Sequence, residues 1–159
     1  MPQNDGNAGG GRALYVHRPA ITFGHTDSAG IVYTVRFFDY GIEAIEGWFR
    51  EILGLSWHEI NIKHHMGTPF VHVDMDMRSP LVPGDDLAVT VRIKEAGRSS
   101  LRFALSGHKG DGILSFEGEW VCVVVDTETM KSMSLPEPYA GRLRDYLALC
   151  EGAASGVGS

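Results

Sequence analysis

The sequence has few cysteines, no long apolar run and no excess of basic charge across its 159 residues. Its two cysteines, Cys122 and Cys150, match no spacing of zinc ligands, and we expect reduced thiols in a cytoplasmic protein. No run approaches the ~20 apolar residues that a membrane-spanning helix requires. The formal net charge of −6 argues against nucleic acid or an anionic membrane as the main partner, because both attract a basic surface.

Hydrophobic residues make up 43% of the chain, which is enough to bury the core of one domain. We expect that domain to cover residues 13–150. Residues 1–12 are rich in glycine and asparagine, and residues 151–159 are rich in glycine, alanine and serine. These compositions favour a disordered N-terminal tail and a flexible C-terminal tail.

The stretch 23–53 contains a glycine-punctuated loop and then the longest helical pattern, which ends near Gly54. Two apolar rows run along this helix at helical spacing. The first row is Phe38, Ile42, Ile45, Phe49 and Ile52, and the second is Phe37, Tyr40, Ala44 and Trp48. A helix that is apolar over most of its circumference has to be largely wrapped by other elements. Gly41 and Gly47 indicate places where another backbone can pack closely against it.

Alternating apolar and polar residues predict strands over Leu14–Phe23, Phe70–Arg78, Asp86–Glu95, Ser99–Ser106 and Ile113–Asp126. Short links join the last four strands, and a short helix over about Tyr139–Leu149 follows them. Residues 55–68 are irregular, and they are compatible with a short turn of helix followed by a loop. A long helix followed by a run of strands predicts an α+β fold, an antiparallel sheet of about five strands wrapped around one long central helix.

The letters FGHTDSAGIVY at residues 23–33 resemble a motif of the hot-dog-fold acyl-CoA thioesterases, in the 4-hydroxybenzoyl-CoA thioesterase family. That motif is an aromatic and a small residue, Asp-x-Asp-x-x-Gly, two apolar residues and an aromatic residue before the long helix. The turn at Ser79–Asp86 and the link at Leu135–Pro138 also match, so the resemblance spans about residues 15–149. It implies a hot-dog fold, hydrolysis of an acyl-CoA without cofactor or metal, and a homodimer or tetramer.

By this resemblance, Asp27 is the catalytic carboxylate. The backbone N–H of Thr34, at the start of the helix, polarises the thioester carbonyl. Gly30 is assigned to the binding of substrate. His25 replaces the first acidic residue of the motif, and Tyr33 immediately precedes the helix, so both are weaker candidates for catalysis.

Two further departures from the family pattern concern the substrate. Ser28 stands where the benzoyl-type enzymes have proline, and Ile42 stands near a position where many members have an acidic residue. The acyl group therefore stays open between an aromatic one, such as 4-hydroxybenzoyl, and a short-to-medium chain. Arg98 lies beside a predicted turn, and its guanidinium suits the phosphates of CoA.

The residues themselves support this chemistry. A helix N-terminus supplies unpaired N–H groups and partial positive charge, which can stabilise the oxyanion of a thioester under attack. A carboxylate one short loop earlier can attack the carbonyl or act as general base on water, and the sequence does not distinguish these routes. Without the resemblance, an aspartate such as Asp27 in a Gly/Ser loop is also typical of a capping or turn residue.

Other functions stay open on the sequence. A thioesterase acting on acyl carrier protein fits the same motif, although an acidic carrier would meet an acidic surface. A non-catalytic acyl-CoA-binding module would keep the fold without hydrolysis. The histidines match no zinc motif, so we expect solvated side chains at His58, His64, His65 and His72.

Overall fold

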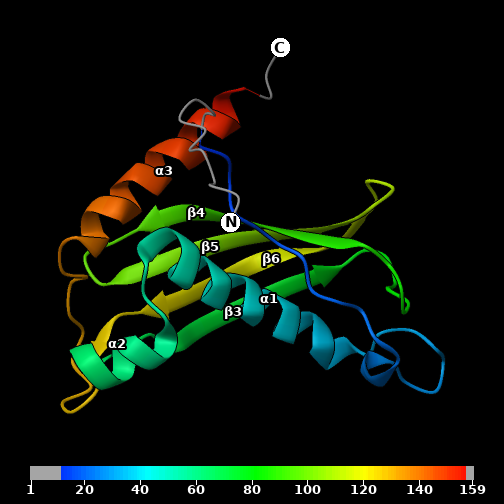
Figure 1. Ribbon diagram of the computed structural model, residues 1–159, viewed down its shortest axis with the longest axis horizontal. Helices are drawn as coiled ribbons and strands as arrows, with labels where there is room; N and C mark the ends of the chain where they lie inside the picture. The colour runs from blue at the N-terminus through cyan, green and yellow to red at the C-terminus, as the bar shows by residue number, and fades with distance from the viewer. Residues whose placement is uncertain (1–11, 157–159) are drawn as a thin grey trace, which may run out of the picture.

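The computed structural model describes residues 12–156, in which a five-stranded antiparallel sheet has a long helix across one face (Figure 1). The strands follow the spatial order β1-β4-β5-β6-β3. They are β1 (Val16–His17), β3 (Phe70–Met77), β4 (Leu87–Ala96), β5 (Ser100–Lys109) and β6 (Leu114–Val123). The predicted α+β class and antiparallel sheet are confirmed. The expected N-terminal tail, apart from Arg12, and residues 157–159 lie outside the described residues.

The central helix has two parts. The α-helix α1 covers Thr34–Trp48, and the chain continues as one π-helical turn, η2, over Phe49–Leu53. Gly54 ends this turn in the left-handed conformation, with a φ of 75°. The expected terminal glycine is therefore confirmed, because glycine adopts this conformation without steric cost.

The sheet covers only one side of this helix. The buried residues of the two parts include Phe37, Tyr40, Ala44, Ile45, Trp48 and Phe49. All of the second predicted row is therefore buried, but the first row is covered only in part. Ile42 remains 37% exposed and Phe38 half-buried. The expectation of a helix wrapped over most of its circumference is thus not met within one chain.

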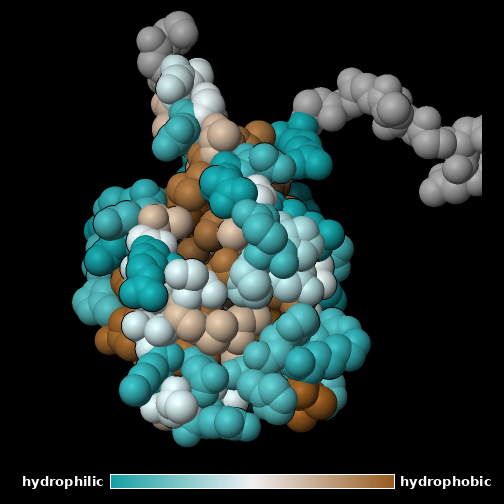
Figure 2. Space-filling view, turned by 90° about the vertical axis from the view of Figure 1, so that its left-hand side faces the viewer, coloured by the Kyte–Doolittle hydropathy of each residue, from teal (hydrophilic) through white to brown (hydrophobic). Residues whose placement is uncertain are grey.

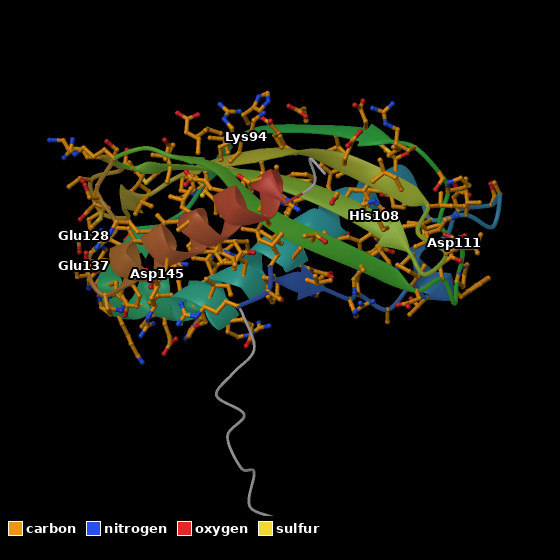
Figure 3. The ribbon with its side chains drawn as sticks, turned by 90° about the horizontal axis from the view of Figure 1, so that it is seen from above. Lys94, His108, Asp111, Glu128, Glu137 and Asp145 are labelled. Carbon is orange, nitrogen blue, oxygen red and sulfur yellow. The ribbon has the colours of Figure 1, made fainter. Side chains whose placement is uncertain are left out.

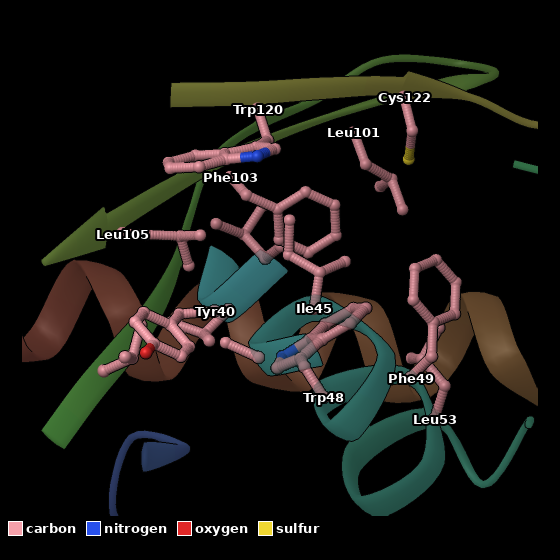
Figure 4. Packing of buried hydrophobic residues seen from close by; sticks show 14 of the residues in the cluster. Tyr40, Ile45, Trp48, Phe49, Leu53, Leu101, Phe103, Leu105, Trp120 and Cys122 are labelled. Atoms are coloured by element: carbon pink, nitrogen blue, oxygen red, sulfur yellow. The ribbon is translucent and has the colours of Figure 1, made fainter. Parts of the chain in front are cut away.

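Aromatic side chains of the helix and the sheet interlock in the core (Figure 4). The rings of Trp48 and Phe103 meet edge to face, with centroids 5.2 Å apart. Gly41 lets the indole of Trp120 lie against the helix, because a Cβ atom at position 41 would come within 2.5 Å of Cζ2 of Trp120. Gly47 gives similar room to a tyrosine ring. Close packing at both glycines is confirmed, but side chains occupy the space where a backbone was expected.

The first strand and the last helix differ in length from the prediction. Within the range Leu14–Phe23, only Val16–His17 forms a strand, and Phe23–His25 turns into the short 3-10 helix η1. Pro19 lacks the N–H that a ladder needs, which explains the early end of β1. The helix α3 (Tyr139–Ser155) continues past Leu149, so residues 151–155 are helical where a flexible tail was expected.

A third helix lies in the segment 55–68, where a short turn of helix followed by a loop was expected. This helix, α2, covers Trp57–His64 and begins with a capping box. The Ser56 side chain accepts the Glu59 N–H, and the Glu59 side chain accepts the Ser56 N–H. The short β2 (Met66–Gly67) follows and pairs with β7 (Val125–Asp126), so the predicted strand 113–126 is divided after β6.

The strand β3 lies at one edge of the sheet and pairs only with β6. Val73 and Met75 pack against the core, as the predicted alternation requires. Val71 was expected on the same face but is 62% exposed. The register shifts between Phe70 and His72, and this bulge turns the side chain outward.

At the opposite side of the sheet, α3 covers the part of β4 that the short β1 leaves open. The hydroxyl of Tyr146 accepts the Tyr15 N–H at 2.8 Å and donates to the Val91 carbonyl at 2.6 Å. Farther along, the Cys150 Sγ accepts the Ile93 N–H at 3.4 Å. Side chains of α3 therefore satisfy backbone groups that a neighbouring strand would otherwise pair.

The sheet face turned away from α1 carries charged side chains, Lys94 among them (Figure 3). Lys94 and Arg102 both form ion pairs with Glu119 across this face. No helix among residues 12–156 is long and apolar enough to cross a membrane.

Candidate active site

A tight loop joins η1 to α1 and carries Asp27. An isolated bridge between Thr26 and Val32 closes the base of the loop, and the Asp27 N–H donates to the Ile31 carbonyl at 3.0 Å. The Gly30 N–H donates to the Asp27 carbonyl at 3.0 Å, and Gly30 adopts a φ of 75°. Most other residues would be strained there, so the loop itself requires glycine at this position.

The Asp27 carboxylate is exposed, and one of its oxygens is already bound. Its Oδ1 accepts the Ala29 N–H at 2.8 Å, as in an Asx turn. Its Oδ2 has no hydrogen-bond partner within residues 12–156. The turn therefore orients the carboxylate and leaves one oxygen available to an incoming molecule.

The N-terminus of α1 follows this loop directly. Tyr33 is the N-cap residue, and its N–H donates to the His25 carbonyl at 3.0 Å. Its side chain is 44% exposed and caps no helical N–H. The N–H of Thr34 has no acceptor in the described part of the chain, as is normal for the first residue of a helix. The helix dipole adds partial positive charge at this point.

A groove of about 230 Å³ lies beside this helix end. Its lining residues are Ile31, Val32, Thr34, Phe37, Met77, Arg78, Ser79 and Pro80. One wall thus comes from the loop and α1, and the other from the end of β3. The Val32 N–H donates to the Leu81 carbonyl at 2.8 Å and joins the two walls. Met77 is 43% exposed, so the groove is open on the side of the β3 edge.

His25 connects the loop to the core. Its Nδ1 lies 2.9 Å from the hydroxyl of Tyr40, which is only 1% exposed. Burial raises the pKa of Tyr40 to about 12, so the hydroxyl stays protonated at neutral pH and can donate to Nδ1. The sequence analysis missed this role of Tyr40. The general signal is that a buried tyrosine needs a polar partner, but the sequence does not name the partner.

Arg98 is not brought near Asp27 within one chain. It lies in the connection from β4 to β5, at the end of the sheet where α3 begins, whereas the Asp27 loop lies at the opposite end (Figure 1). There it lines a pocket of about 240 Å³ together with Leu101, Leu143 and Leu147. Figure 2 shows this end of the molecule, with hydrophobic residues framed by hydrophilic ones.

No group of three or more His, Cys, Asp or Glu side chains in residues 12–156 is placed to hold a metal ion. The four histidines expected to be solvated, His58, His64, His65 and His72, are all exposed, and two of them also have a partner. His64 packs edge to face on Tyr139, with ring centroids 5.7 Å apart, and His72 lies 3.0 Å from a carboxylate oxygen of Asp74.

An antiparallel sheet curled on one helix, with an acidic loop at the N-terminus of that helix, defines a hot-dog domain. Residues 21–143 match the family model of the thioesterase-like superfamily, and the chain belongs to this superfamily. The protein is accordingly an enzyme, a thioester hydrolase.

Relatives and solved structures agree with this membership. The 1,4-dihydroxy-2-naphthoyl-CoA hydrolase of Synechococcus elongatus is 28% identical over 140 residues, which cover 86% of this chain and 97% of that protein. A thioesterase-superfamily structure from Jannaschia sp. CCS1 superposes with a TM-score of 0.75 at 28% identity, over 94% of this chain and 98% of that one. A Staphylococcus aureus structure in complex with CoA has a TM-score of 0.79 at 20% identity and covers 86% and 85%, which shows the shared fold.

Proposed function

We propose that this enzyme hydrolyses an aromatic acyl-CoA, with Asp27 as the catalytic carboxylate and the Thr34 N–H as the oxyanion donor. One observation carries the proposal. A carboxylate oxygen and a backbone N–H, both without partners in the described residues, lie on one short loop–helix junction beside a mostly apolar groove. Thioester hydrolysis needs both groups, because one drives the attack and the other stabilises the resulting oxyanion.

Two routes use these residues. In the general-base route, Asp27 takes a proton from water while the water oxygen attacks the carbonyl carbon. In the nucleophilic route, Asp27 itself attacks, forms a mixed anhydride and is released by water. In both routes the carbon–sulfur bond breaks and the electron pair leaves with the thiolate of CoA, so no strong general acid is needed. Label from H₂¹⁸O in the Asp27 carboxylate after a single turnover would identify the nucleophilic route.

The choice of an aromatic acyl group rests on the groove and on the relatives. Phe37 and Met77 both line the groove and suit a flat ring. The Synechococcus relative is named for a dihydroxylated naphthoyl-CoA. We therefore favour a hydroxylated aromatic acyl group, of the 4-hydroxybenzoyl or dihydroxynaphthoyl kind. Short-to-medium acyl chains and acyl carrier protein are the alternatives, and the acidic net charge of −6 disfavours the acidic carrier.

We further propose that the enzyme works as a homodimer, or as a tetramer of such dimers, joined through β3. The outer edge of β3 has no strand partner within the described residues. On α1, Glu43 and Gly47 face β1, because they contact His17 and Tyr15. By helical spacing, Val35, which is half exposed, and Ile42 lie on a different flank of α1 from these two residues, and we infer that this flank faces the β3 edge.

A second copy paired along β3 would cover this apolar flank and remove the open edge. Light scattering after gel filtration should give twice or four times the chain mass of 17.4 kDa. A monomer at micromolar concentration would contradict this assembly.

The test of the function is hydrolysis of a panel of acyl-CoAs, with free CoA detected by a thiol reagent. We expect Asp27→Asn to lower kcat at least ~100-fold, equivalent to about 2.7 kcal/mol. The matched control is Asp145→Asn, which changes an exposed carboxylate on α3 far along the chain. Undiminished activity in Asp27→Asn would exclude Asp27 as the catalytic residue, and a preference for aliphatic or carrier-bound substrates would exclude the aromatic assignment.

A further inference from the structure

The groove beside the N-terminus of α1 is bounded by the end of β3 but lacks a wall beyond that edge. Its apolar lining ends at Met77, which is 43% exposed, and the neighbouring Tyr33 and Val35 are 44% and 50% exposed. A ligand held in one chain alone would keep one side in water. The missing wall is therefore best supplied by the second copy that pairs along β3.

The topology fixes which part of the partner comes close. If the two-fold axis is perpendicular to the sheet, so that both α1 helices lie on the same face, the two edge strands pair antiparallel and the start of one β3 lies beside the end of the other. The end of β3 is Met77, in the groove, and its start is Phe70. Residues just before Phe70 in the partner, which are β2 and the C-terminus of α2, then face the open side of the groove.

Within this segment, His65 has an unusual backbone. It is the C-cap of α2 and has a φ of 50°, one of two non-glycine residues with positive φ in the described chain. Its carbonyl accepts the Thr127 N–H at 2.9 Å, and its own N–H donates to the Ile60 carbonyl, so the backbone is fixed. A left-handed conformation costs most residues about 1–2 kcal/mol, and glycine or asparagine is usual there.

The His65 side chain is exposed and makes no hydrogen bond within residues 12–156. Its neighbour His64 behaves differently, since it packs on Tyr139 of its own α3. A strained backbone that holds an exposed polar side chain without a hydrogen bond favours a functional role for that side chain.

We propose that the partner subunit's His65 closes the groove and hydrogen-bonds a ring hydroxyl of the acyl group. This inference rests on the proposed function and on the proposed dimer. Two polar side chains of the lining are already engaged: Arg78 pairs with Asp76 and Glu117, and the Ser79 hydroxyl donates to the Leu114 carbonyl. A further polar contact to the ring is therefore best supplied from the open side. An imidazole can donate through one nitrogen and accept through the other, which suits a phenolic hydroxyl. His65 is then a specificity-determining residue of the neighbouring subunit's site.

The first test is His65→Gly, assayed with 4-hydroxybenzoyl-CoA and with benzoyl-CoA. Glycine relieves the backbone strain, so the variant should fold at least as stably as the parent, and lost activity cannot be ascribed to unfolding. We expect kcat/KM to fall at least tenfold for the hydroxylated substrate and less than threefold for the unsubstituted one. The control is His58→Ala, which removes another exposed histidine of α2. Equal effects on both substrates, or none, would overturn the proposal.

The second test asks whether Asp27 and His65 act across subunits. Differently tagged Asp27→Asn and His65→Gly chains are co-expressed, and the mixed dimer is isolated and assayed with the hydroxylated substrate. If each site combines Asp27 of one subunit with His65 of the other, one of the two sites in the mixed dimer has both native residues. About half of the wild-type activity then returns. If both residues act in the same chain, neither site is intact and the activity stays no higher than that of the His65→Gly homodimer, which refutes the proposal. A fully active Asp27→Asn homodimer, or a wild-type enzyme that cleaves no aromatic acyl-CoA, would instead refute the proposed function and remove the basis of this inference.

Discussion

Replacing Thr34 by proline would remove the proposed oxyanion donor and little else. Thr34 is the first residue of α1, and its N–H has no acceptor in the described chain. Proline is tolerated at this helix position because the missing N–H is unpaired there in any case. The residue before a proline should be extended, and Tyr33 already has φ −81° and ψ 150°. The native backbone at Tyr33 and Thr34 therefore already has the conformation that proline at position 34 requires.

The expected effect separates catalysis from stability. Loss of one oxyanion donor costs about 2.7–4 kcal/mol of transition-state stabilisation, so kcat should fall about 10²–10³-fold. The free energy of unfolding should stay within about 1 kcal/mol of the parent, because the change is compatible with the native backbone. Thr34→Ala keeps the N–H, and we expect it to retain most of the activity.

Steady-state hydrolysis of the preferred acyl-CoA and urea denaturation measure the two quantities on the same preparations. A folded Thr34→Pro enzyme with more than a third of the parental kcat would show that the oxyanion is stabilised elsewhere. A large loss in Thr34→Ala would assign the effect to the side chain instead.

Three further predictions concern the fold that supports the site. Tyr146→Phe should lower the free energy of unfolding in urea by about 2–3 kcal/mol, because one buried and one partly buried backbone group lose their partner. A value near that of the control Tyr139→Phe would contradict this. Gly41→Ala should lower the free energy of unfolding by about 1–3 kcal/mol through overpacking. Gly152→Ala, with nothing within 4 Å of the new Cβ, should raise it by about 0.4–1 kcal/mol. Equal changes in the two variants would refute the packing argument. Burial raises the pKa of Tyr40 and of Tyr146 from 10.0 to about 12. The contribution of the two protonated hydroxyls to stability is therefore complete below pH 10 and is lost as the pH rises through 12. Thermal melts recorded against pH should show this loss of stability, and the loss should be smaller in Tyr40→Phe.

The sequence predicted the parts of the fold whose cause is local. Alternation over β3 to β6 reflects a sheet with one buried face, and Gly54 ends the helix for a steric reason that acts at a single residue. The capping box at Ser56 and Glu59 was also legible, and weighting it would have located α2. The order and type of the main elements therefore followed from short-range rules.

The rest depended on contacts between distant residues. Which row of α1 is buried is decided by where the sheet lies, and Val71 turns outward because of a bulge that alternation does not encode. The pairing of His25 with Tyr40 joins residues 15 positions apart. The groove needs the end of β3 as its second wall. For the same reason, the roles of Asp27, Thr34, Gly30 and Arg98 stay predictions until activity is measured.

The contact between α3 and β4 limits how many copies of this chain can assemble through their sheet edges. The hydroxyl of Tyr146 and the thiol of Cys150 hydrogen-bond backbone groups of β4 on one margin of the sheet. The other margin, along β3, is left receptive, because its outer backbone groups have no strand partner within the described residues. A molecule with a single receptive margin can take up one like molecule, and growth by strand addition then stops. Capping by α3 thus makes strand addition self-limiting and protects the protein from fibre growth. A chain truncated before Tyr139 would have two receptive margins and the means to polymerise.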